Sequence, residues 1–272
     1  MNFWISVLRW LDTPMETPTL YGAYHLFWLL LVVASTVLLC LFARKVSGKT
    51  VCNVMLGVAI AVTILEIYKQ INYTFSYDSG VIEANYQWYA FPWQFCSTPM
   101  YVGLLAGIFR KGKFHDSLCA YLATYAVFAG LCVMIYPGDV FTGTAGINLQ
   151  TMVCHGSMIV VGIYLLASGY VKLEHRTILR ALPVFAGAIL VAMALNELAY
   201  CTGLLEEHSF NMFYISPYCE GHLPVYSQVQ AVVSYPWCLV IYLVAFTAAA
   251  YLVLLAAMGV AQLCKPKKVS AK

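Results

Sequence analysis

Cys96 and His155 are the residues of this 272-residue chain whose types could carry out covalent chemistry. A thiolate attacks carbonyl carbons, and a histidine within hydrogen-bond reach can take up its proton, so the two form the nucleophile and base of acyl transfer. Cys96 lies between Pro92 and Pro99 at the start of an apolar segment, where the positive end of a helix dipole favours the thiolate. We expect the two side chains to form a reaction site inside a membrane. The alternatives are a small packed cysteine and a histidine bonded between helices.

The composition places this site in a membrane protein. Hydrophobic residues make up 62% of the chain and charged residues only 10%, against about 25% charged in soluble proteins. The mean hydropathy is +0.77. We therefore predict an all-α membrane protein with one polytopic domain over residues 1–272. Seven apolar segments approach the roughly 20 residues that a crossing helix needs. They are 20–43, 51–71, 91–109, 117–136, 149–170, 177–200 and 236–263.

The basic residues determine the expected orientation. Thirteen of the fifteen lysines and arginines fall in alternate connections and in the C-terminal tail. By the positive-inside rule the N-terminus lies outside and the C-terminus in the cytoplasm, which requires an odd number of spans. We divide the chain into a possible interfacial helix within 1–19, a seven-helix bundle over 20–263 and a basic cytoplasmic tail over 264–272. The expected location is the cell membrane.

The predicted topology converts positions along the chain into depths. The third and fifth spans start outside, and Cys96 and His155 each lie about six residues in, or about 8–9 Å below the outer edge. Polar residues of other spans fall at the same depth. The full set is His25, Glu66, Lys69, Gln94, Cys96, His155, Asn196 and Glu197. Because ionisable residues in spans usually mark function, we expect one outward-facing polar cavity rather than separate interfacial or self-neutralising groups.

The supporting residues have expected roles in acyl transfer. Gln94 and free N–H groups at helix starts would hold an oxyanion, and Glu66 or Glu197 would orient the imidazole. Pro99 cannot donate to the carbonyl four residues back, so the Phe95 carbonyl loses its usual partner. Ester bonds of glycerophospholipids lie at this depth. The expected substrate is therefore a membrane phospholipid, with no metal, cofactor or nucleic acid.

The long outer loop over 200–235 is a second place with potential ligands. It holds His208, His222 and Cys219, but their spacing is not that of a metal site, so we expect a solvated loop. Cys201 and Cys219 could pair as a disulfide if this loop faces an oxidising side.

Five short motifs occur in order along most of the chain. They are Glu66-Ile-Tyr-Lys69, Phe91-Pro-Trp-Gln-Phe-Cys-Ser97, Tyr136-Pro-Gly138, Gln150 with His155-Gly156, and Asn211-Met-Phe-Tyr214 with Pro217. In this order they resemble the YwaF-like bacterial membrane proteins, a family similar to the eukaryotic transmembrane protein 164, a lipid acyltransferase. The resemblance implies a seven-span fold and a Cys96–His155 pair that moves a fatty acyl group between phospholipids. One departure is Gln94, which stands where many relatives have histidine.

Two other classes of function compete with a lipid acyltransferase or acyl hydrolase. A transporter or a small-molecule or lipid-binding protein could use the same polar layer without covalent chemistry. No inverted repeat or pair of broken helices favours transport, and the polar groups stop at one depth. An assembly factor without chemistry is the third alternative. The sequence carries no signal for an oligomeric state.

Overall fold

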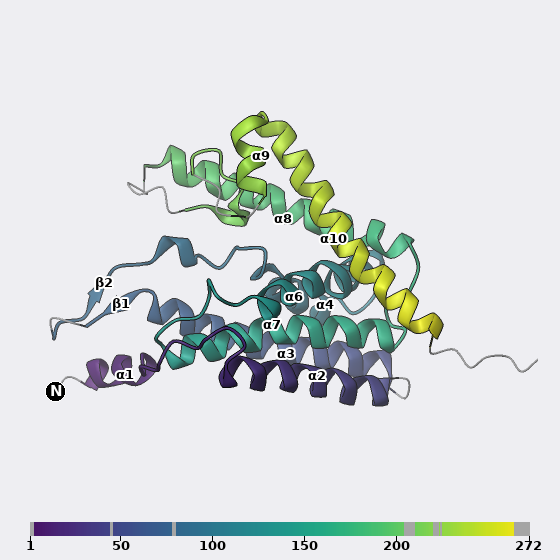
Figure 1. Ribbon diagram of the computed structural model, residues 1–272, viewed down its shortest axis with the longest axis horizontal. Coiled ribbons are helices and arrows are strands. Elements are labelled where there is room, and N and C mark those ends of the chain that lie inside the picture. The colour runs from purple at the N-terminus through teal and green to yellow at the C-terminus, as the bar shows by residue number, and fades with distance from the viewer. Residues whose placement is uncertain are drawn as a thin grey trace, which may run out of the picture.

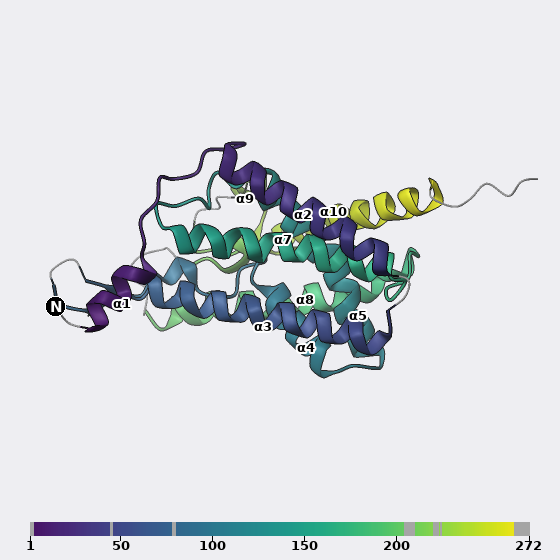
Figure 2. The same ribbon diagram turned by 90° about the horizontal axis from the view of Figure 1, so that it is seen from below.

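The computed structural model describes residues 3–43, 46–77, 80–203, 210–219, 223 and 225–263. In these ranges the chain forms a helical bundle with one short hairpin, as predicted for an all-α membrane protein (Figures 1 and 2). The long helices are α2 (Ala23–Ala43), α3 (Gly48–Asn72), the continuous run of α5 (Lys113–Tyr121), η2 (Leu122–Ala126) and α6 (Val127–Ile135), α7 (Ala145–Ala167), α8 (Arg176–Cys201) and α10 (Tyr235–Leu263). The short elements are α1 (Phe3–Leu11), β1 (Phe75–Ser76), β2 (Glu83–Ala84), η1 (Trp88–Ala90), α4 (Thr98–Ile108), η3 (Met212–Tyr214) and α9 (Tyr226–Val232).

Six helices in the described part of the chain are long and apolar enough to cross a membrane. They match six of the seven predicted spans, with ends that differ by at most four residues. The third predicted span, 91–109, contains only the 11-residue α4, which is about 16 Å long and shorter than the bilayer core. The chain is therefore a multi-pass membrane protein, while the count of seven spans and the sides of the termini stay predictions.

The segment before α4 differs from the continuous helix that the sequence predicts. Proline suits the first turn of a helix, where its missing N–H is no loss, and α4 begins at Thr98 with Pro99 as its second residue. Pro92 and Cys96 consequently lie outside the helix, Cys96 in a turn. The Thr98 hydroxyl donates to the Phe95 carbonyl at 2.9 Å. The carbonyl that Pro99 leaves without its usual donor thus has a side-chain partner.

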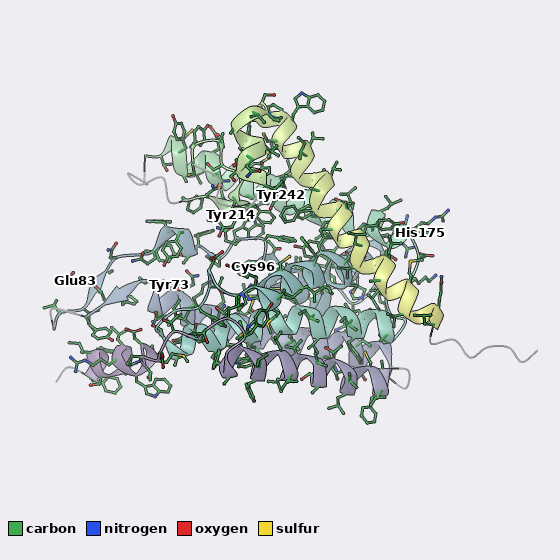
Figure 3. All side chains as sticks on the ribbon, viewed as in Figure 1. Tyr73, Glu83, Cys96, His175, Tyr214 and Tyr242 are labelled. Carbon is green, nitrogen blue, oxygen red and sulfur yellow. The ribbon has the colours of Figure 1, made fainter. Side chains whose placement is uncertain are left out.

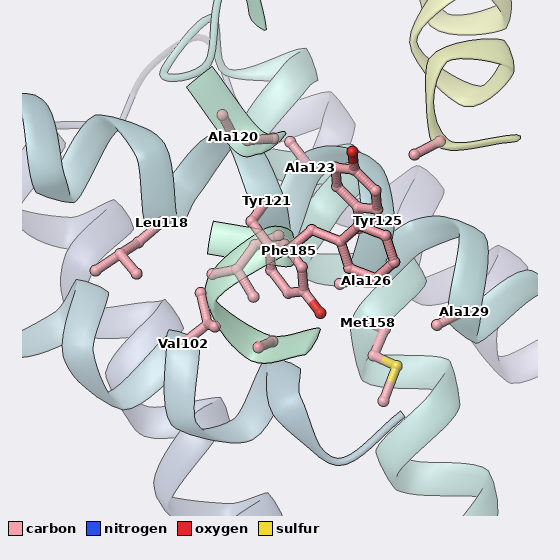
Figure 4. Close-up of a cluster of buried hydrophobic side chains, with 14 of the residues drawn as sticks. Val102, Leu118, Ala120, Tyr121, Ala123, Tyr125, Ala126, Ala129, Met158 and Phe185 are labelled. Atoms are coloured by element: carbon pink, nitrogen blue, oxygen red, sulfur yellow. The ribbon is translucent and has the colours of Figure 1, made fainter. Parts of the chain in front are cut away.

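The α5–η2–α6 run and α7 form the centre of the bundle. In the most apolar stretch of each, 72% of the residues are buried, against 6% of those in α2 and 22% of those in α10 at the periphery. Figure 4 shows the aromatic part of this core, where Tyr121 and Tyr125 lie beside Phe185 of α8. The rings of Tyr125 and Phe185 stack with their centroids 4.4 Å apart. The core therefore joins α8 to the central run.

Two glycines allow α7 to pack closely on the central run. A Cβ at Gly130 of α6 would lie 2.6 Å from the His155 carbonyl oxygen, and a Cβ at Gly162 of α7 would lie 2.6 Å from the Leu122 carbonyl oxygen. Both distances are too short for any other residue without a shift of the backbone. Small residues are the usual means of close helix approach in membranes. The turn of α7 that carries His155 is therefore fixed by backbone contact with α6.

The N-terminal segment contains the expected short helix. Phe3, Trp4 and Trp10 of α1 are exposed, whereas Ile5 is buried. Large apolar side chains on an exposed face suit a helix at the membrane interface, and the placement of α1 at that interface stays a prediction. The basic tail over 264–272 lies outside the described residues.

The described parts of the loop between α8 and α10 contain no disulfide. Cys201 and Cys219 are both free thiols. The Cys201 thiol donates to a Glu197 carboxylate oxygen at 3.5 Å, and the Cys219 thiol donates to the Phe210 carbonyl at 3.5 Å. The possible pairing of these cysteines is therefore not formed. His208 and His222 lie outside the described residues.

Candidate active site

Cys96 lies in the interior of the molecule, between the layer that holds α3 and α7 and the layer that holds α8 and α10 (Figure 3). The turn that carries it is half-buried. The Cys154 thiol of α7 lies 4.0 Å from the Cys96 carbonyl oxygen and points toward it. Two charged groups, the Lys69 ammonium and the Glu66 carboxylate, act electrostatically on the Cys96 thiol. The turn thus brings a thiol to one end of a polar network of α3.

His155 has one engaged and one free ring nitrogen. Its Nδ1 lies 2.7 Å from the Thr151 carbonyl oxygen. Because a carbonyl can only accept, Nδ1 carries the proton and Nε2 keeps its lone pair. Nε2 is buried and has no hydrogen-bond partner. The structure therefore holds His155 in the tautomer that a general base needs.

Cys96 and His155 lie in one region but are not bonded to each other. Among the residues that the structure describes, no hydrogen bond joins the Cys96 thiol to the His155 ring. Cys154, the residue before His155 in α7, contacts the Cys96 carbonyl oxygen, and the Lys69 charge acts on both the Cys96 thiol and the His155 ring. Catalytic hydrogen bonds are often long before substrate binds and tighten later. The arrangement supplies a thiol and a base without a formed pair.

Glu66 is the centre of a buried polar network rather than the partner of the imidazole. Its Oε1 accepts from Lys69 Nζ at 2.7 Å and from Gln70 Nε2 at 2.7 Å. Its Oε2 accepts from Gln150 Nε2 of α7 at 3.0 Å. The prediction that Glu66 orients His155 is wrong, because in the described structure Nδ1 of His155 bonds the Thr151 carbonyl and Nε2 has no partner. The network links α3 to α7 beside the Cys96 turn.

Gln150 and Cys154 are the neighbours of the site to which the sequence analysis assigned no role. Gln150 appeared only within a motif. The two residues are four apart in α7, so they share one helix face, which packs toward α3 and the turn of Cys96. From the sequence alone, this spacing of four could have indicated that Gln150 and Cys154 lie on the same helix face.

The side-chain amides of Gln94 and Asn196 both hold the segment around η3. Gln94 accepts from the Phe213 N–H at 2.9 Å and donates to the Asn211 carbonyl at 3.0 Å. Asn196 accepts from the Met212 N–H at 2.8 Å and donates to the Met212 carbonyl at 3.1 Å. Phe213 has a φ of +58°, which such contacts stabilise. The Gln94 amide thus binds the η3 segment, and its role in holding an oxyanion stays a prediction.

His25 and Glu197 also serve elsewhere. His25 bonds the Met134 carbonyl at 2.8 Å and the Tyr21 N–H at 3.0 Å, which ties α2 to the end of α6. Glu197 is exposed near the end of α8 and accepts from the Tyr218 hydroxyl at 2.8 Å. The eight predicted residues thus do not share one cavity. Glu66 and Lys69 act electrostatically on the Cys96 thiol. The other four supporting residues make structural contacts. Neither of the two predicted carboxylates orients His155.

An open groove of about 340 Å³ runs along α3 beside this network. Glu66 and Gln70 line it from α3, and Pro92, Met100 and Tyr101 line it from the segment around α4. Most of the lining is apolar. The groove connects the polar network to the outer surface of α3, where the exposed Ile67 faces the surroundings of the bundle.

A second cysteine–histidine contact lies at the opposite ends of α3 and α7. The Cys119 sulfur is 3.4 Å from His115 Nε2, which also bonds the Tyr170 hydroxyl at 2.7 Å. The same hydroxyl lies 3.1 Å from the Cys52 sulfur. The expectation that the polar groups stop at one depth is therefore wrong. Because His115, Cys119 and Cys52 are all nearly inaccessible and both ring nitrogens are engaged, we assign this cluster a structural role.

Comparison with known proteins identifies the family of the chain. No curated protein and no solved structure matches it. One family model does match, over residues 20–255, a range that begins just before α2 and ends within α10 and includes every site residue described above. The chain is therefore a multi-pass membrane protein that belongs to the TMEM164 family.

Proposed function

We propose that this protein is a lipid acyltransferase or acyl hydrolase that uses Cys96 as nucleophile and His155 as general base. The observation that carries the proposal is the buried, unpartnered Nε2 of His155. Buried polar atoms are almost always hydrogen-bonded, and an unpaired one costs about 1–3 kcal/mol. A base that must accept a proton during the reaction is one reason to retain such an atom. The family's resemblance to lipid acyltransferases supports the same assignment.

We assign to Lys69 the stabilisation of the negative charge that forms during the reaction. Its ammonium is largely buried beside Glu66 and acts on both Cys96 and His155. A fixed positive charge favours a thiolate and stabilises an oxyanion in a water-poor site. Lys69 therefore shares the role that the sequence analysis gave to Gln94.

The proposed reaction has two steps. In the first, the Cys96 thiol gives its proton to Nε2 of His155 and its sulfur attacks the ester carbonyl carbon of a phospholipid. The ester C–O bond breaks, and the leaving lysophospholipid oxygen takes the proton from the imidazolium. The acyl group is now a thioester on Cys96.

The second step returns the enzyme to its starting state. Nε2 of His155 takes the proton of an acceptor hydroxyl, from a lysolipid in a transferase or from water in a hydrolase. The acceptor oxygen attacks the thioester carbonyl, the C–S bond breaks, and the imidazolium reprotonates the Cys96 sulfur. Because Cys96 lies in a turn rather than in a helix, its sulfur can approach His155 when substrate is bound.

The substrate reaches the site through the groove beside α3 in this proposal. Its apolar lining suits an acyl chain, and Glu66 and Gln70 lie where the polar part of the lipid would enter. We also propose the seven-span topology, with α4 and the turn before it as the third crossing, the N-terminus outside and the C-terminus in the cytoplasm. Under that topology the thiol lies below the headgroups of the outer leaflet.

The test is thioester formation by purified protein in lipid vesicles with phosphatidylcholine that carries a labelled acyl chain. We expect label on the wild type that hydroxylamine releases, and none on Cys96→Ser. Cys132→Ser is the matched control, because Cys132 is an exposed free thiol of α6. Label that persists on Cys96→Ser would contradict the proposal.

A lipid-binding protein without covalent chemistry is the second candidate function. It is favoured by one observation, that the Cys96 thiol and the His155 ring are not bonded to each other in the described structure. This candidate predicts that the wild type binds labelled phosphatidylcholine without forming a thioester. It also predicts that Cys96→Ser binds the lipid as well as the wild type does.

A further inference from the structure

A second open groove lies between α8 and α10, on the far side of the bundle from the groove of α3. It has a volume of about 530 Å³. Its walls are aliphatic: Ile178, Leu179 and Leu182 line it from α8, and Leu243 and Val244 line it from α10. Both helices are candidate membrane spans, so acyl chains surround this face in a bilayer.

The groove ends in a polar pair at the start of α8. Nδ1 of His175 lies 2.6 Å from the Tyr251 hydroxyl, and both residues line the groove. If Tyr251 donates, the neutral imidazole keeps an N–H at Nε2; if His175 donates, Tyr251 keeps its O–H. Either arrangement leaves one hydrogen-bond donor at the end of an apolar channel. Figure 3 shows His175 at the end of the molecule opposite Tyr73 and Glu83.

Positive charge is concentrated around this polar end. Lys172 and Arg176 are exposed on either side of His175. Arg180 is one turn further along α8 and pairs with Glu174 at 3.0 Å. Glu174 thus offsets only one of the three basic residues. Neither Lys172 nor Arg176 takes part in an ion pair within the described part of the chain.

We propose that this groove binds an anionic phospholipid, with one acyl chain between α8 and α10 and the phosphate at Arg176, His175 and Tyr251. Basic pockets between membrane helices are suited to anionic headgroups. The charge complementarity selects an anionic lipid over a zwitterionic one, and the aliphatic walls select a lipid over a free phosphate. The site is independent of Cys96 and of the proposed acyl transfer.

The test compares lipid binding in nanodiscs of phosphatidylcholine with and without phosphatidylglycerol. We expect phosphatidylglycerol to raise the unfolding temperature of the full-length protein and to remain bound in native mass spectra. Arg176→Gln should weaken that binding about fivefold, the factor for one basic residue near an anionic lipid. The matched control is Arg110→Gln, which removes a basic residue from the α4–α5 connection, where its Nε bonds the Gly107 carbonyl.

A second variant separates the groove from general surface charge. Leu179 is exposed and lines the groove, so Leu179→Trp should fold and should fill the channel without a change of charge. We expect it to lose phosphatidylglycerol binding as Arg176→Gln does. The proposal is overturned if Leu179→Trp binds phosphatidylglycerol like the wild type, if Arg176→Gln and Arg110→Gln behave alike, or if phosphatidylcholine stabilises the protein equally well.

Discussion

Nδ1 of His155 donates to the carbonyl oxygen of Thr151, one turn earlier in α7, across 2.7 Å. This bond sets the tautomer of the ring with no carboxylate. In many catalytic triads a carboxylate holds the histidine and stabilises its charged form. Here a backbone carbonyl does the positioning, and the nearby positive charge is that of Lys69. The geometry suits a histidine that stays neutral until it takes the proton of a neighbouring thiol.

The first prediction concerns that ring. His155→Gln keeps a side chain of similar reach but has no basic nitrogen, so acyl transfer should fall by about 100- to 10,000-fold, the usual contribution of a general base. The rate of hydroxylamine-sensitive labelling measures the change. A variant that folds and labels within a few-fold of the wild type would exclude His155 as the base.

The second prediction concerns the His115–Cys119 contact. His115→Gln disturbs the bonds to the Ala106 carbonyl and the Tyr170 hydroxyl. It should therefore cost about 1–3 kcal/mol of stability, the range for buried groups left unpaired. Thioester formation per folded molecule should be unchanged. The measurements are thermal unfolding and labelling, with Cys119→Ser in parallel, and label mapped to Cys119 by mass spectrometry would instead make this pair the nucleophile and base.

The positions of the long helices could be predicted from the sequence because crossing a lipid bilayer requires long apolar segments, which are easily recognised. A crossing helix must be long, apolar and internally hydrogen-bonded, so six spans are located within four residues of their observed ends. The predicted start of the third span was wrong. Its composition is apolar, but Pro99 and the contacts of Gln94 with the η3 segment keep 91–97 out of the helix. Those contacts join residues more than a hundred positions apart, which no local pattern reveals.

The polar layer shows the same limit. Depth along a helix was predictable only to about one turn, because α7 begins at Ala145 rather than at 149 and His155 therefore lies deeper in its helix than predicted. Glu66 and Lys69 do act electrostatically on the Cys96 thiol. The direction in which each side chain points around its helix was not predictable. His25 faces the end of α6 and Asn196 faces η3, because helix rotation depends on tertiary packing in bundles whose helices have little amphipathic character. Depth alone therefore overestimated how many polar residues share one site.

The third prediction concerns the ion pair of the site. Glu66→Ala leaves the Lys69 ammonium without its partner in a place where its side chain is only 16% exposed. Loss of one partner of a buried pair costs about 3 kcal/mol or more, so the free energy of unfolding in mixed micelles should fall by that amount. Lys69→Met in the same chain should recover part of the loss. Strictly additive effects of the two substitutions would show that the pair is not coupled.

The fourth prediction concerns alkaline pH. Tyr86 lies in the loop before α4, and burial raises its pKa to about 12, with the Glu66 carboxylate adding to the shift. The unfolded chain loses the tyrosine proton near pH 10, before the folded protein does. The stabilising contribution of Tyr86 is therefore complete below pH 10 and is lost as the pH rises toward 12. Unfolding temperatures measured between pH 9 and 12 should fall less steeply for Tyr86→Phe; equal slopes would contradict the shift.

The fifth prediction compares two glycines that both lie within helices, one with open space beside it and one with a crowded environment. Alanine normally stabilises a helix by about 1 kcal/mol relative to glycine. A Cβ at Gly187 of α8 meets nothing within 4 Å, whereas a Cβ at Gly130 meets the His155 carbonyl at 2.6 Å. Gly187→Ala should thus leave stability unchanged or higher. Gly130→Ala must push α6 away from the turn that carries His155, so both the unfolding temperature and the rate of thioester formation should fall. If Gly130→Ala lowers stability without slowing the labelling of Cys96, the close approach of α6 supports the fold but does not position the base.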